Sequence, residues 1–191
     1  KNFRNPPAKP EKWHHVDVFP EFKVWNYAVH SNRAIPGFTI MQDVRKEGFK
    51  ISMRKWLPNG PFVENSLLEI ETDSIYVPNE ILQVVSSASP YVEVKKEEIK
   101  ADDSAKLKLK LSGFGTDIGI FRSGDQGYLS VPDIRLNLDM PVSNETFQIK
   151  PVIFNKGGSN VENVEIAVIS KNADLEILTE PQTISAISSL E

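Results

Sequence analysis

The residue types best suited to chemistry gather near the start of the chain, in the segment Trp13–Asp17. It sets two imidazoles, His14 and His15, beside the Asp17 carboxylate, and such groups bind divalent metals. A histidine here could also serve a neighbouring catalytic domain as an acid or base. Adjacent strand residues point to opposite faces, which works against one metal shared by His14 and His15. We therefore expect packing rather than catalysis, with His14, His15 and Asp17 as the alternative metal ligands.

A second set of candidates is aromatic. Exposed tryptophans and tyrosines in a row can stack on sugar rings, and Trp56, Tyr76 and Tyr91 are the candidates for such a carbohydrate-binding surface. Aromatic side chains also fill β-sandwich cores because each buries a large area. Trp25, inside an apolar run, is expected in the core, whereas Trp56, next to a turn, is the one most suited to exposure.

Paired carboxylates occur at Glu97-Glu98 and Asp102-Asp103. Glycoside hydrolysis needs two carboxyl groups that face each other across a cleft, and sequence-adjacent pairs do not imply that arrangement. Calcium at Asp102-Asp103 or around Asp125 is a minor alternative, since hard cations take oxygen ligands. The sequence holds no Gly-x-Ser-x-Gly elbow, phosphate-binding loop or dinucleotide fingerprint. We expect no catalytic residue and no cofactor in this chain.

Composition narrows the function classes. The chain of 191 residues has 22 basic and 26 acidic side chains and a net charge of -4, too balanced for phosphate-driven nucleic-acid binding. No apolar run approaches the ~20 residues of a membrane span. The absence of cysteine excludes disulfides and thiolate zinc sites. A core must therefore come from packing alone.

Two-residue alternation of apolar and polar side chains is the dominant pattern. The run Lys106–Leu111, KLKLKL, is the clearest strand, and Phe22–Val29 is expected to form another. Short strands separated by Gly and Pro turns predict an all-β chain with an Ig-like or jelly-roll-like β-sandwich. We expect a Pro-rich connector over residues 1–18, a sandwich module over 19–124, and an Ig-like module over 125–191.

The last residues also alternate, in the segment Ile184–Glu191. An edge strand without neighbours is a liability for a β-protein. We expect the native polypeptide to continue beyond this segment, or a partner to supply the missing strands, so the second module is expected to be incomplete.

Two stretches carry sequence motifs that are shared with known families. The first contains FPEFKVWNY (19–27), PGFT (36–39), Gly48-Phe49, WLPNGP (56–61) and LKLSGFGTDIGI (109–120). Through these motifs, residues 13–121 resemble the β-region that follows the catalytic domain in bacterial multidomain esterases of the α/β-hydrolase class. The second contains Asn144-Glu145, FNKGG (154–158) and VENV (161–164), through which residues 128–180 resemble the start of Ig-like adhesion-type or hydrolase-associated modules of bacterial exported proteins.

These resemblances imply an extracytoplasmic, multidomain setting beside an ester- or carbohydrate-directed hydrolase. The leading expectation is a non-catalytic accessory or scaffolding region whose partners are neighbouring domains. The alternatives are a carbohydrate-binding module that contacts polysaccharide, and a fragment that contributes His14 or His15 to a neighbouring catalytic domain. Neither nucleic acid nor a membrane span is expected.

Overall fold

A computed structural model gives the fold, and it describes residues 9, 14–32, 37–138, 142–172 and 174–189. These residues form strands and connections without a helix, so the all-β prediction is confirmed. The strands are β1 (His14–Asp17), β2 (Glu21–Val24), β3 (Tyr27–Ser31), β4 (Gly37–Arg45), β5 (Gly48–Lys55), β6 (Leu67–Thr72), β7 (Ile81–Ser87), β8 (Lys95–Lys100), β9 (Lys108–Ser112), β10 (Thr116–Phe121), β11 (Leu129–Leu136), β12 (Ile149–Asn155), β13 (Val161–Ile166) and β14 (Gln182–Ile187).

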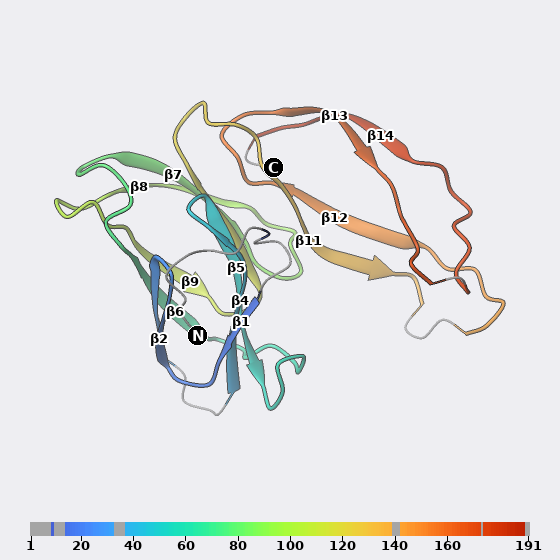
Figure 1. Ribbon diagram of the computed structural model, residues 1–191, viewed down its shortest axis with the longest axis horizontal. Helices are drawn as coiled ribbons and strands as arrows, with labels where there is room; N and C mark the ends of the chain where they lie inside the picture. Colours follow the sequence, from blue (N-terminus) through green and yellow to red (C-terminus); the bar gives the residue numbers. More distant parts are fainter. Residues whose placement is uncertain (1–8, 10–13, 33–36, 139–141, 173, 190–191) are drawn as a thin grey trace.

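The first ten strands build a two-layer antiparallel sandwich (Figure 1). One layer is a six-stranded sheet in the order β1-β4-β5-β10-β7-β8, and the other is a four-stranded sheet in the order β2-β3-β6-β9. Strand alternation sends every second side chain between the layers. In β5, Phe49, Ile51 and Met53 are buried in the shared core, while Lys50 and Arg54 lie on the outer face.

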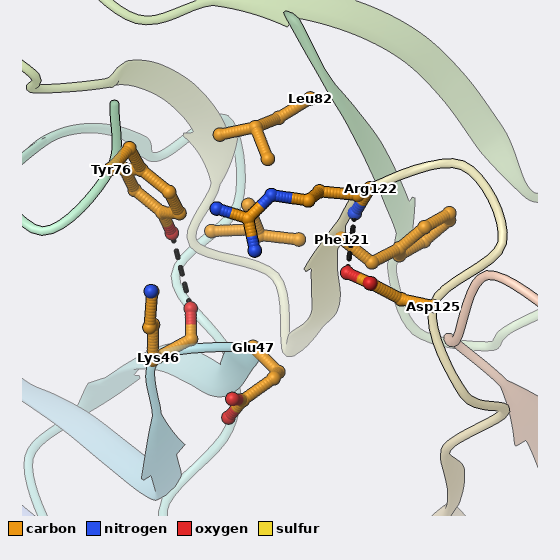
Figure 2. Close-up of a pocket in the computed structure, with 8 residues that line it drawn as sticks. Lys46, Glu47, Tyr76, Leu82, Phe121, Arg122 and Asp125 are labelled. Atoms are coloured by element: carbon orange, nitrogen blue, oxygen red, sulfur yellow. Dashed lines mark hydrogen bonds between the residues drawn. The ribbon is translucent and has the colours of Figure 1, made fainter. Parts of the chain in front are cut away.

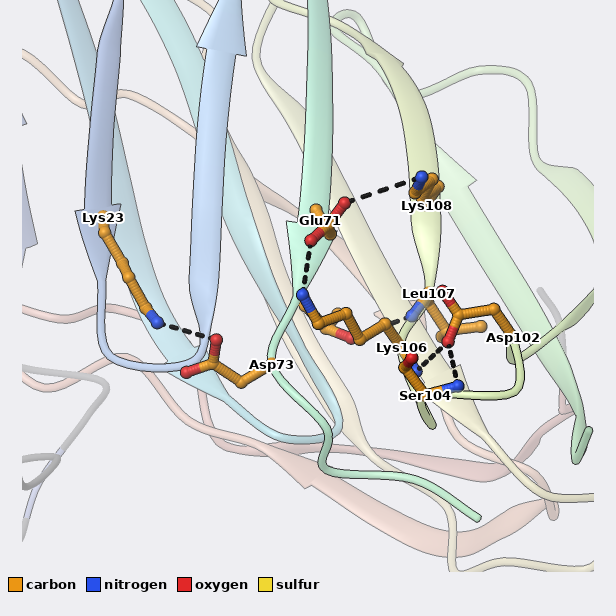
Figure 3. Close-up of polar contacts among 9 residues, drawn as sticks. Lys23, Glu71, Asp73, Asp102, Ser104, Lys106, Leu107 and Lys108 are labelled. Carbon is orange, nitrogen blue, oxygen red and sulfur yellow. Dashed lines mark hydrogen bonds and ion pairs between the residues drawn. The ribbon is translucent and has the colours of Figure 1, made fainter. Parts of the chain in front are cut away.

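The alternation of Lys and Leu in β9 gives one buried face and one exposed face, as predicted. Leu109 and Leu111 of β9 are buried, and Lys108 and Lys110 are exposed. Antiparallel register places these lysines opposite acidic residues of β6, with Lys110 opposite Glu69. Figure 3 shows the resulting ion pairs, including Lys106 Nζ to Glu71 Oε1 at 2.7 Å and Lys108 Nζ to Glu71 Oε2 at 3.7 Å. The lysines therefore balance neighbouring carboxylates on the solvent face of an edge strand.

Two sequence predictions need correction. The connector predicted over residues 1–18 ends early, because His14–Asp17 forms β1 and pairs with β4. The single strand predicted over Phe22–Val29 is a hairpin, in which β2 and β3 pair around Trp25 and Asn26. Trp25 has a φ of 46°, and its half-buried side chain packs against the core. Alternating apolar residues continue on both sides of such a tight turn, so periodicity alone did not locate it.

Antiparallel register gathers the connections of the sandwich at two ends. The β1–β2, β5–β6, β7–β8 and β9–β10 connections lie at one end, which we call the Trp56 end. The β2–β3, β4–β5, β6–β7 and β8–β9 connections lie at the other, which we call the Tyr76 end. The chain also leaves β10 at the Tyr76 end and passes through residues 122–128 into β11.

The remaining strands form two separate antiparallel hairpins beside the sandwich, in orange and red in Figure 1. β11 pairs with β12, with a bulge between Ser130 and Asp133, and β13 pairs with β14. The β11–β12 hairpin lies against the outer face of the six-stranded sheet, where Phe154 packs with Val85 and Phe121. The outer face of the six-stranded sheet is therefore partly covered by the β11–β12 hairpin.

The alternation in β9 gives a matched stability test. Leu109→Ala removes a fully buried side chain, and we expect it to lower the free energy of unfolding by about 2–5 kcal/mol. Lys110→Ala removes one exposed ion pair with Glu69, and we expect a loss of at most about 1 kcal/mol. Urea denaturation followed by fluorescence measures both values. Equal losses for the two variants would contradict the assigned faces of β9.

Candidate functional site

A buried ion pair joins the sandwich to the C-terminal hairpins. Lys156 Nζ lies 2.5 Å from Asp117 Oδ1, and the two side chains are only 1% and 2% exposed. The second carboxylate oxygen of Asp117 accepts a hydrogen bond of 2.8 Å from the Ser130 hydroxyl. The ammonium of Lys156 also lies 5.0 Å from the centre of the Tyr128 ring. Both charges are thus held by polar and aromatic partners away from water.

The local backbone explains how the pair meets. Asp117 and Gly119 lie on the outer face of β10, since Ile118 and Ile120 between and beyond them enter the core. Lys156 directly follows β12, and its amide donates to the Tyr128 carbonyl at 2.8 Å. A Cβ atom at Gly119 would lie 2.2 Å from the Lys156 carbonyl oxygen. Glycine at 119 therefore allows the backbone of Lys156 to cross β10 closely enough to reach Asp117.

Further polar contacts extend along this interface. The Tyr128 hydroxyl donates to the Asp43 carboxylate, the Lys50 ammonium donates to the Pro132 carbonyl, and Arg135 donates to the Pro90 carbonyl. Burial raises the pKa of Tyr128, and the hydrogen bond to Asp43 raises that pKa further. The phenol therefore stays protonated at neutral pH and remains a hydrogen-bond donor.

The pKa of Lys50 changes in the opposite direction to that of Tyr128. Burial lowers the pKa of the Lys50 ammonium, because water no longer stabilises its charge fully. The neighbouring carboxylates of Asp117 and Asp133 oppose that change by attracting the proton. The interface therefore combines the buried Lys156–Asp117 pair with part-buried and exposed hydrogen bonds from Tyr128, Lys50 and Arg135.

A small pocket of about 60 Å³ opens at the Tyr76 end, where the chain leaves the sandwich (Figure 2). The Tyr76 hydroxyl donates to the Lys46 carbonyl at 3.1 Å, and Asp125 accepts from the Arg122 amide at 2.7 Å. Arg122 forms an ion pair with Glu80. Binding sites for drug-sized molecules measure roughly 300–1,000 Å³. This pocket accommodates water-sized guests rather than a sugar ring.

The three predicted sugar-stacking residues do not form one platform. Trp56 is 76% exposed, as its position beside a turn indicates. Tyr91 is half-buried at the same end, with the Lys50 ammonium 5.5 Å from its ring centre. Tyr76 is half-buried at the opposite end of the sandwich. Burial raises the pKa of both tyrosines, so both remain neutral phenols.

The two predicted metal-binding histidines, His14 and His15, also lie in different surroundings. His15 lies opposite buried Met41 and contacts the Phe22 ring at a centroid distance of 5.3 Å, while exposed His14 lies opposite Gln42. His15 Nε2 lies 3.1 Å from Asp17 Oδ2. Trp13 falls outside the described residues, as does Pro36 of the first resemblance. Within the described ranges, no group of three or more His, Asp or Glu side chains is arranged to hold a metal ion.

The carboxylate pairs belong to ordinary surface structure. Glu97 and Glu98 are exposed on β8, where Glu98 accepts a hydrogen bond of 2.6 Å from Gln83. Asp102 Oδ1 accepts from the amides of Ser104 and Lys106 at 2.8 and 3.0 Å, which closes the turn before β9 (Figure 3). Asp103 accepts from the Asn79 side chain.

Comparison with known proteins yields no relative: no family model, no curated protein and no solved structure matches this chain. In the part of the chain that is described, no helix has the length and apolar character required to cross a bilayer.

Sequence reasoning missed the Lys156–Asp117 pair. The two residues are 39 positions apart, and nothing in a single sequence links them. One signal was present: Asp117 is the only charged residue of the strand TDIGIF, and a charge inside a buried strand requires a partner. The identity of that partner depended on how the C-terminal hairpin docks.

The ion pair can be tested by a double-mutant cycle. Asp117→Leu leaves a buried lysine unpaired, and we expect it to lower the free energy of unfolding by about 3–5 kcal/mol. We expect a comparable loss for Lys156→Met, and a much smaller loss for the double variant, because neither charge then remains buried. Chemical denaturation measures all three, with exposed Lys171→Met as the control. Additive losses would show that the two side chains are not coupled.

Proposed function

We propose that this chain is a non-catalytic scaffolding region, which holds a β-sandwich and a C-terminal β-module in a fixed relative position. The observation that carries the proposal is the buried Lys156–Asp117 pair, backed by the close crossing of Gly119 by Lys156. A flexible tether needs no such contact, whereas a buried pair of charges is satisfied in only one arrangement of the two parts.

Other features support the same role. The pocket at the Tyr76 end measures about 60 Å³, which is smaller than the roughly 300–1,000 Å³ of a typical ligand site. The proposed setting is an extracytoplasmic multidomain hydrolase directed at esters or carbohydrates, with neighbouring domains as partners. This setting, and the Ig-like character of the C-terminal module, rest on the resemblances in segments such as 109–120 and 154–158.

Rigid coupling predicts a narrow distance distribution between the two parts. The chain has no cysteine, so Lys110→Cys on the sandwich and Lys171→Cys beyond β13 can be spin-labelled cleanly. We expect one narrow distance in this pair and a broad distribution after Gly119→Ala, whose Cβ would meet the Lys156 carbonyl at 2.2 Å. Pulsed electron paramagnetic resonance measures both.

Ser123→Val, which enlarges an exposed side chain in the linker between β10 and β11, is the control and should leave the distance unchanged. A broad distribution before any substitution in the interface would contradict the scaffolding role. Hydrolysis of acetylated or feruloylated xylan by the purified chain would overturn its non-catalytic character.

A second candidate function is carbohydrate binding, which the exposure of Trp56 favours. Trp56 has a φ of 61° and is 76% exposed, with exposed Leu57 beside it. A left-handed backbone is costly for a bulky residue, and such positions cluster at functional sites. Because Tyr76 lies at the opposite end and Tyr91 is half-buried, Trp56 would stack on a single sugar ring at the start of the β5–β6 connection.

Stacking by one tryptophan predicts weak but specific binding. If it occurs, Trp56→Ala should abolish retention of the chain on a polysaccharide affinity gel, while Leu57→Ala, which removes a neighbouring exposed apolar side chain, should retain it. Urea denaturation serves to show that both variants stay folded. Equal retention of Trp56→Ala and the unsubstituted chain would exclude this second candidate.

A further inference from the structure

Lys156 is the only buried lysine in the described part of the chain, and its amine meets a carboxyl group. Lys156 Nζ lies 2.5 Å from Asp117 Oδ1, and the two side chains are almost completely excluded from water. The Lys106–Glu71 pair has a similar separation of 2.7 Å, but its side chains are 33% and 36% exposed. An amine and a carboxyl group held together without water are the two halves of an amide bond.

The surroundings of the pair fix the approach of the amine to the carboxyl carbon. The Ser130 hydroxyl holds the second carboxyl oxygen of Asp117 at 2.8 Å, and the Tyr128 ring lies 5.0 Å from the amine. The close crossing of Gly119 by the Lys156 backbone fixes the other end of the lysine. Reacting groups held in a near-attack geometry gain effective molarities of about 10⁵–10⁸ M over free groups in solution.

We propose that Lys156 and Asp117 condense in the folded chain to an amide bond, which cross-links β10 of the sandwich to the C-terminal hairpins. The inference rests on the proposed scaffolding role, because it makes the same junction permanent. Burial favours the reaction, since two desolvated charges are costly whereas the amide that replaces them is neutral.

The condensation balances with the groups that are present. The Lys156 ammonium first gives a proton to Asp117 Oδ1, which leaves a neutral amine beside a carboxylic acid. The amine lone pair attacks Cγ, a carbon–nitrogen bond forms, and negative charge develops on Oδ2, where the Ser130 hydroxyl donates. The nitrogen then gives a second proton to Oδ1, the bond between Cγ and Oδ1 breaks, and one water molecule leaves.

Loss of that water is measurable by mass spectrometry of the purified chain under denaturing conditions. We expect an intact mass that is lower than the sequence mass by one water molecule. Trypsin should release one branched peptide that joins residues 111–122 to residues 136–171, because trypsin does not cleave at an acylated lysine or between Lys150 and Pro151. The Lys106–Glu71 pair is the internal control and should yield only unlinked peptides.

Two substitutions separate the cross-link from the ion pair. Lys156→Arg keeps a cation opposite Asp117, but an arginine guanidinium stays protonated and does not attack, so the full sequence mass is expected. Ser130→Ala removes the donor on Oδ2 and should slow the appearance of the linked chain at least about tenfold after rapid purification. A merely structural role for Ser130 would leave this rate unchanged.

A folded chain with the full sequence mass and no branched peptide would overturn the cross-link. A narrow spin-label distance in that same chain would still support the scaffolding role, so the two proposals fail separately. Water loss that persists in Lys156→Arg would also overturn the cross-link, because the water would then come from another group. Equal linkage of Lys106 to Glu71 would do the same, since it would show condensation without burial.

Discussion

Two opposite charges removed from water set the relation between the two halves of this chain. Lys156 and Asp117 are almost completely buried, and the desolvation of each is offset only while the other lies within contact distance. An apolar pair of similar size would tolerate small shifts of the C-terminal hairpin, because dispersion contacts have little directionality. The ion pair, with Ser130 bound to the second carboxylate oxygen, is satisfied in one position. Its contribution is therefore chiefly to the specificity of docking.

Residues near the ion pair complete the interface between the sandwich and the C-terminal hairpins. Gly119 lets the Lys156 backbone approach β10, and the cluster of Val85, Phe121 and Phe154 seals the neighbouring surface from water. The outer face of the six-stranded sheet is therefore used for packing, whereas the outer face of the four-stranded sheet carries exposed ion pairs such as Lys110 with Glu69. The C-terminal hairpins differ again, because their apolar faces and the β14 edge remain open. The chain thus combines a sandwich that has a buried core with C-terminal hairpins whose apolar side chains are partly exposed.

Local pattern predicted much of this fold. The alternation of Lys and Leu identified β9 and its buried face, because a strand sends consecutive side chains in opposite directions whatever lies around it. The same reasoning separated His14 from His15 before the sheet was known. It failed at Trp25, where a two-residue turn preserves the alternation on both sides and a hairpin resembles one long strand. Exposure of Trp56 was predicted from its turn, whereas the separation of Tyr76 from Tyr91 required the order of the strands.

The sequence by itself determined the strand type, the inward side chains of most strands and the absence of cysteine chemistry, because these depend on composition or on neighbours one and two residues away. Only the tertiary structure decided that Asp117 meets Lys156, that Gly119 lies beneath Lys156, and that β14 lies at the edge of a two-stranded sheet. The physical reason is the distance along the chain over which each effect acts. Periodicity acts along a single strand, whereas the partner of a buried charge or of a sheet edge depends on how strands distant in the chain are ordered and docked.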